Sequence, residues 1–230
     1  MHEKKHLLTQ AQTGPQTPAS SEPRTGLAHL RPTRPVEVLP PDALRSERLV
    51  LRPLVAADRA EFVRVMQESR EHLARFSPLH MPGESDDALF DRQLALTAEG
   101  DATGRACRRI AVEDSGRIVG AFNLNAIRRG LSCEGDANCW LALSAIGKGY
   151  ATEAFVALLA HAFADLPEGL GLHRVLVGVQ TENTASQQLV ERLGFVKTGP
   201  NTTYLHAGGK WDLHEMYAAS PESFEARCAG

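Results

Sequence analysis

In the first half of the chain, apolar residues recur with two different periods, one typical of strands and one typical of helices. Leu49 and Leu51 alternate with Arg48 and Arg52, which predicts a half-buried strand that ends before Pro53. Helical spacing of apolar residues follows, with acidic or capping residues at the starts of the segments. The pattern predicts three helices: 56–67, 68–76 and 85–99.

The second half is richer in strands. Two apolar runs joined through Asp114-Ser-Gly116 predict a hairpin over 109–113 and 118–127. Further patterns predict strands over 137–143, 173–180, 195–198 and 210–218, and helices from Ala151 and over 182–193. This order of helices and strands indicates a mixed α/β sheet protein.

One stretch, WLALSAIGKGYATEAFVALL over 140–159, reads as a strand, a glycine turn and the start of an amphipathic helix. Glycines at 147 and 149 permit positive φ, and the first amides of a helix have no partner inside it. Such a place suits a phosphate group, but taken alone the glycine turn is more simply interpreted as a plain connection into a helix. The chain has neither GxxxxGK[ST] nor a complete GxGxxG with an acidic residue at the right distance.

Composition excludes several classes of function. The 230 residues are 43% hydrophobic and 23% charged, with a net charge of −3, so there is no basic footprint for direct nucleic-acid binding. No run approaches 18 apolar residues, and the N-terminus lacks a secretory signal, so we expect a cytoplasmic protein that does not enter a membrane. The four cysteines show no metal spacing, and we expect no metal site.

The pattern also divides the chain. Residues 1–42 hold seven of the thirteen prolines and few large apolar side chains, which predicts a disordered tail. We expect one folded domain over 43–220 and a short C-terminal tail over 221–230. A monomer and a homodimer are both compatible with the sequence.

The motifs resemble a known family. Ile146-Gly-Lys-Gly-Tyr-Ala151, followed by ENTASQQLVERLGF over 182–195, is similar to the GNAT superfamily of acetyl-CoA-dependent N-acetyltransferases. SERLVLRPL over 46–54, ESREHL over 68–73 and YLHAGGKWDLHEMYA over 204–218 resemble its RimJ/RimL group, which acetylates the N-terminal amine of ribosomal proteins. The resemblance implies a mixed, mostly antiparallel sheet of about six to seven strands flanked by helices.

The resemblance also implies where acetyl-CoA, the acetyl donor, binds. The glycine turn would hold the diphosphate, and the preceding strand would pair with pantetheine through backbone groups of Leu141, Ala142 and Leu143. The first turn position is Gln or Arg in many relatives and is Ile146 here. The other implied contacts are Gly147, Lys148, Gly149, Tyr150, Ala151, Thr152, Asn183 and Ser186.

Catalytic side chains are implied less directly. Many relatives carry a tyrosine acid where this chain has Val190; Ser186, one turn earlier, is our candidate to protonate the leaving thiolate. Glu134, Asp136 and Glu182 are candidate bases, although the simpler interpretation of each is a solvated loop carboxylate. Asn183 either caps its helix or binds pantetheine, or does both. Cys139 is expected to be a small buried residue rather than a nucleophile.

These observations leave three functions open. The first is acetylation of the N-terminal α-amine of a ribosomal or other protein by direct attack on the thioester. The second is acetylation of a small amine, such as an antibiotic, a polyamine or an aminoacyl compound. The third is a non-catalytic acyl-CoA-binding module, against which the presence of both Asn183 and Ser186 argues.

Overall fold

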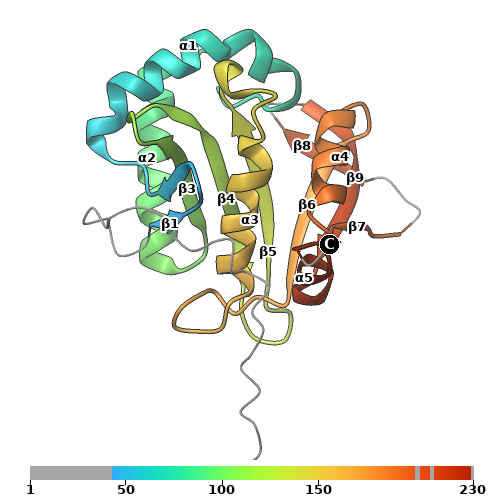
Figure 1. Ribbon diagram of the computed structural model, residues 1–230. Coiled ribbons are helices and arrows are strands. Elements are labelled where there is room, and N and C mark those ends of the chain that lie inside the picture. Colours follow the sequence, from blue (N-terminus) through green and yellow to red (C-terminus); the bar gives the residue numbers. More distant parts are fainter. Residues whose placement is uncertain (1–42, 200–202, 208–209, 229–230) are drawn as a thin grey trace, which may run out of the picture.

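The computed structural model describes residues 43–199, 203–207 and 210–228, which form one sheet covered by helices (Figure 1). The expected tail over 1–42 lies outside the described residues. In these residues the sheet has nine strands in the order β1-β2-β3-β4-β5-β6-β9-β7, and β8 pairs with β9. The strands are β1 Leu44–Arg45, β2 Leu49–Arg52, β3 Cys107–Glu113, β4 Ile118–Arg128, β5 Glu134–Leu141, β6 Arg174–Gln180, β7 Val196–Lys197, β8 Thr203–Ala207 and β9 Lys210–Ala219.

The expected mixed, mostly antiparallel sheet is confirmed. Seven of the nine strands are longer than two residues, and β5 and β6 alone among the described pairs run parallel. The strand β8 was not predicted. The helices are α1 Arg59–Phe76, α2 Asp86–Thr103, α3 Tyr150–Phe163, α4 Thr184–Arg192 and α5 Pro221–Cys228, with short 3-10 turns η2 Ala56–Asp58 and η3 Leu143–Ala145.

Helix α1 is one element, so the prediction of two helices over 56–67 and 68–76 was wrong. Its buried side chains recur at helical spacing through the expected break: Phe62, Val65, Met66, Ser69 and Leu73. A continuous apolar stripe lets the whole segment pack against the sheet and against α2.

The helices form layers on the two faces of the sheet. Phe62 of α1 contacts Phe90 of α2 and Trp140 of β5 edge-on, so α1 and α2 share one face. On the other face Phe122 of β4 packs edge-on against Phe155 of α3, with ring centroids 5.3 Å apart. Figure 1 shows α3 running lengthwise beside the strands β4 and β5. The site elements are therefore fixed on both sides by aromatic contacts.

The C-terminal segment differs from expectation. We expected a short tail over 221–230, whereas Pro221–Cys228 form helix α5. Phe224 is only 3% exposed and packs against Phe163 at the end of α3, with ring centroids 5.8 Å apart. Gly194 allows α5 to pack this closely, because a Cβ at that position would lie 2.4 Å from the carbonyl oxygen of Ser223.

Candidate active site

The glycine turn before α3 has the geometry of an anion site. Gly147 and Gly149 have φ of 74° and 79°, in the left-handed region that favours glycine. The first backbone bond of α3 runs from the Glu153 amide to the Gly149 carbonyl, 3.1 Å, and no side chain caps the helix. The amides from Gly149 to Thr152 therefore have no partner within the helix, and the positive end of the helix dipole lies beside them. Ile146, Gly147, Lys148 and Gly149 are all exposed.

The strand before this turn separates from its parallel neighbour. Pairing between β5 and β6 covers Glu134 with Arg174, Gly135 with Val175 and Asp136 with Leu176, and ends there. Strand β5 nevertheless continues to Leu141, held by β4 on its other side. The edge of β5 over 137–141 is thus left without a strand partner on the β6 side, and an extended ligand can pair with such an edge.

The backbone at Ala142 and Leu143 is already in use. The Ala142 amide donates to the Val119 carbonyl at 2.9 Å, and the Leu143 amide donates to Oγ of Ser69 on α1 at 3.0 Å. The reason is that η3 turns the chain away from the strand direction at Leu143. Of the strand residues expected to meet pantetheine, Leu141 lies on the edge that lacks a strand partner. Ser69 lay within a motif of the resemblance, but nothing in the sequence predicted this contact.

Helix α4 brings Asn183 and Ser186 together. The Asn183 side chain accepts a hydrogen bond from the Ser186 amide at 3.1 Å and is therefore the N-cap. Its side-chain nitrogen is not used in that bond. Ser186 is half-buried, and within the described residues its hydroxyl makes no hydrogen bond. Val190 is buried in the core, one turn further along. Ser186 thus keeps its hydroxyl available at a half-buried position of this helix.

The candidate bases differ in their surroundings. Glu134 is buried and accepts hydrogen bonds from Arg174 and, at 3.0 Å, from Arg128. These arginines lower the pKa of Glu134 below its ordinary value, Arg174 most. Arg128 also bonds Asp136 at 3.0 Å. Glu182 lies exposed just before α4. Glu134 and Asp136 are therefore carboxylates in an arginine network, and the lowered pKa makes Glu134 a poor proton acceptor at neutral pH.

Cys139 lacks the properties of a nucleophilic thiolate. Its side chain packs against the core, and burial raises the pKa of the thiol to about 12. A thiol with that pKa stays protonated at neutral pH, and only the thiolate is strongly nucleophilic.

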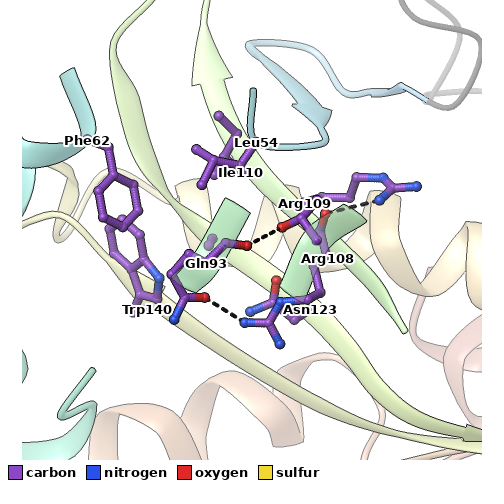
Figure 2. Close-up of a pocket in the computed structure, with 10 residues that line it drawn as sticks. Leu54, Phe62, Gln93, Arg108, Arg109, Ile110, Asn123 and Trp140 are labelled. Atoms are coloured by element: carbon purple, nitrogen blue, oxygen red, sulfur yellow. Dashed lines mark hydrogen bonds between the residues drawn. The ribbon is translucent and has the colours of Figure 1, made fainter. Parts of the chain in front are cut away.

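The sheet face under α1 and α2 carries a row of amide side chains. Asn123 of β4 donates to Asn138 of β5 at 2.9 Å. Beside them Arg108 of β3 donates to Asn125 at 2.6 Å. Arg108 also donates to Gln93 of α2 at 2.7 Å (Figure 2). Burial, together with Arg92, lowers the pKa of Arg108. The hollow above this row has a volume of about 20 Å³, room for a single water rather than for a ligand.

A larger cavity lies beside α1. It has a volume of about 230 Å³ and a mostly apolar lining that includes Met66, Leu73 and Leu79. Arg70 and His80 also line it, and both bond the Asp86 carboxylate, at 2.6 and 2.8 Å. Pro78, Leu79 and His80 therefore bring the loop between α1 and α2 to the side of this pocket.

Two further classes of site find no support in the described part of the chain. No group of three or more His, Cys, Asp or Glu side chains there is arranged to hold a metal ion. Among the same residues, every helix is too short or too polar to span a bilayer.

Comparison with known proteins agrees with this geometry. Residues 48–196 match the family described as acetyltransferase (GNAT) domain. The chain is 27% identical over 182 residues to the probable N-acetyltransferase YjcK of Bacillus subtilis, covering 76% of this chain and 95% of YjcK. It is 25% identical over 185 residues to the ribosomal protein uS5-alanine N-acetyltransferase of Escherichia coli, covering 78% of this chain and 91% of that enzyme.

A solved structure is similar over nearly the whole fold. RimJ of Mycobacterium smegmatis, in complex with CoA-disulfide, superimposes with a TM-score of 0.71 at 26% identity, covering 81% of this chain and 93% of that one. The uncapped turn and the diverging strands fit a thioester carried on a nucleotide diphosphate. The chain belongs to the GNAT acetyltransferase family, in its RimJ/RimL-like group, and is an acetyl-CoA-dependent N-acetyltransferase.

Proposed function

We propose that this enzyme acetylates the N-terminal α-amine of a protein, with a ribosomal protein as the first candidate, in the cytoplasm. The observation that carries the proposal is the similarity to the uS5-alanine N-acetyltransferase over 91% of that enzyme. In the same proposal, the diphosphate of acetyl-CoA binds the amides from Gly147 to Ala151. Pantetheine then follows the edge of β5 toward Asn183.

The charges on the α1 and α2 side favour this acceptor over a polyamine. A polyamine carries several ammonium groups, which a site must meet with unpaired carboxylates. Here Asp86 is bonded by Arg70 and His80, and Glu134 and Asp136 are bonded by arginines. The sheet face itself presents neutral amides and the cation of Arg108. A peptide offers one amine followed by neutral amide groups, which these side chains can hydrogen-bond.

The chemistry demands little from side chains. An α-amine has an ordinary pKa of about 7.7–8.0, so a substantial fraction is neutral at pH 7 and can attack the thioester carbonyl directly. Orientation of two bound reactants lowers a barrier by about 7–11 kcal/mol, against about 3–5 kcal/mol for a general base worth about 10²–10⁴ in rate. In this proposal, backbone amides of β5 stabilise charge on the carbonyl oxygen, and the hydroxyl of Ser186 returns a proton to sulfur.

The test is a thiol-release assay with acetyl-CoA. Peptides with different N-terminal residues form one panel; polyamines, aminoglycosides and aminoacyl compounds form the other. Release with peptides alone supports the proposal, and the same peptides with an acetylated N-terminus serve as the control. Release with small amines alone would replace the proposed acceptor by the second function. If calorimetry detects no CoA binding to the folded protein, the proposed CoA site is wrong.

A further inference from the structure

A segment about a hundred residues before the glycine turn holds that turn in place. Arg48, immediately before β2, donates from Nη1 to the carbonyl oxygen of Lys148 at 3.0 Å. Its guanidinium lies over the ring of Tyr150, 4.5 Å from the centroid. It also lies against Gly149, where an added Cβ would be 3.5 Å from Nη2. Arg48 therefore contacts the turn at three successive residues.

The same arginine pairs with an acidic residue of α3. Glu153, in the first turn of the helix, accepts from Nε of Arg48 at 2.7 Å and forms an ion pair with Nη2 at 2.6 Å. The other carboxylate oxygen of Glu153 accepts from the Arg48 amide at 2.7 Å and from the hydroxyl of Ser46 at 2.6 Å. Tyr150 is fixed from its far end as well, because its hydroxyl donates to Glu113 of β3.

We propose that Arg48 is a positioning residue for the CoA diphosphate: it orients the Lys148–Gly149 peptide and cancels the charge of Glu153 beside the binding amides. The proposal rests on the proposed position of the diphosphate. It concerns two separate effects, one on backbone direction and one on charge.

The backbone effect follows from peptide geometry. A trans peptide is planar, with its carbonyl and its N–H on opposite sides. Arg48 binds the carbonyl of Lys148, and so the N–H of Gly149 points away from Arg48. The N–H of Gly149 therefore already points to the side of the turn where the diphosphate would bind. The peptide does not have to reorient when the diphosphate binds.

The charge effect follows from where Glu153 sits. A carboxylate in the first turn stabilises an empty helix N-terminus, but it repels a bound diphosphate at the same place. In the wild-type protein Arg48 neutralises this carboxylate. Without the Arg48 side chain, the Ser46 hydroxyl and the main-chain amide of residue 48 would still hold Glu153 near the turn, now with an unpaired negative charge.

The experiment is calorimetric titration of CoA into the full chain and its variants, with thermal unfolding measured in parallel. Arg48→Ala is expected to raise the Kd of CoA by about tenfold, equivalent to about 1.4 kcal/mol. Arg59→Ala is the matched control. Arg59 has the same side-chain exposure of 43%, pairs with two carboxylates of α2 and lies over the ring of Phe90, yet contacts no part of the turn. Its Kd is expected to stay within about twofold of wild type.

The double variant Arg48→Ala/Glu153→Gln separates positioning from a purely structural role. Removing the unpaired charge is expected to recover about a third to a half of the lost binding free energy, although both halves of the ion pair are then gone. A purely structural clamp would show no recovery. If Arg48→Ala does not fold, Arg48→Gln takes its place with the same expectations.

The outcomes are distinct. Wild-type affinity in folded Arg48→Ala would overturn the proposal, and so would a double variant that binds as weakly as the single one. Failure of the wild-type protein to bind CoA would instead contradict the proposed diphosphate site.

Discussion

Asp136 of β5 and Leu176 of β6 form the last pair between these two strands, although β5 continues for five residues and β6 for four. Beyond this pair the two strands no longer share backbone hydrogen bonds. The divergence leaves the edge of β5 over 137–141 without a strand partner on the β6 side, and this edge leads to the glycine turn. The proposed path of pantetheine depends on this interruption of the sheet, whereas the proposed diphosphate position depends on the turn itself.

Gly149→Ala tests the turn. A residue with a Cβ pays about 1–2 kcal/mol in the left-handed region, so we expect a fall in Tm of about 2–8 °C together with weaker CoA binding by calorimetry. Gly116→Ala is the control, because Gly116 has a similar φ of 83° with nothing within 4 Å of an added Cβ. It should lose comparable stability and keep its CoA affinity. Wild-type CoA affinity in Gly149→Ala would contradict the proposed diphosphate position.

Ser186→Ala tests the leaving-group acid. We expect kcat to fall by about 10²-fold, the lower end for acid catalysis, since a thiol of pKa near 8.5 already leaves as a tolerable anion. The Kd of CoA should change little, because the Asn183 cap bonds the backbone amide of residue 186 rather than its hydroxyl. Thr184→Ala, at an exposed position of the same helical turn, serves as the control. An unchanged kcat in Ser186→Ala would remove Ser186 from the mechanism.

Glu134→Gln distinguishes a base from a structural carboxylate. The two arginines that lower its pKa keep Glu134 ionised throughout the working pH range, so we expect a lower Tm and an unchanged pH profile. In both proteins kcat/KM for a peptide should rise with pH and level off near the amine pKa of about 7.7–8.0. Glu182→Gln, at an exposed position, provides the comparison. A large loss of kcat at constant Tm in either variant would identify that residue as the base.

The variant Glu84→Gln tests how the stability of the fold depends on pH in the acid range. Arg92 donates two hydrogen bonds to Glu84 and lowers the pKa of its carboxyl from 4.5 to about 2. Because the folded pKa is depressed, the ionised carboxylate stabilises the fold above pH 4.5, and this contribution is lost as the pH falls from 4.5 toward 2.

We therefore expect Glu84→Gln to unfold at a lower temperature than wild type at pH 7, with the gap closing as the pH falls to 3. Thermal unfolding followed by circular dichroism measures this. Glu71→Gln, exposed on α1, should follow the wild-type curve. A gap that widens on acidification would contradict the pKa direction.

Features set by neighbouring residues were accessible from the sequence. The alternation of Leu49 and Leu51, the glycines of the turn and the Asn183 cap each depend on contacts within a few residues, so pattern and residue type predict them. The mixed sheet followed from the order of such local features, and the family followed from the resemblance of the motifs. The single helix α1 was missed because its apolar stripe continues through a segment that we divided in two.

Tertiary structure alone decided the features that join distant segments. The sequence names Glu134 as a carboxylate near the right strand, but its pairing with Arg174 is possible only because β6 lies beside β5. The same holds for the bond of Arg48 to Lys148 and for that of Ser69 to the Leu143 amide. Sequence patterns report on local backbone preference and burial, whereas the charge state of a carboxylate and the direction of a peptide depend on which remote side chains the fold places next to them.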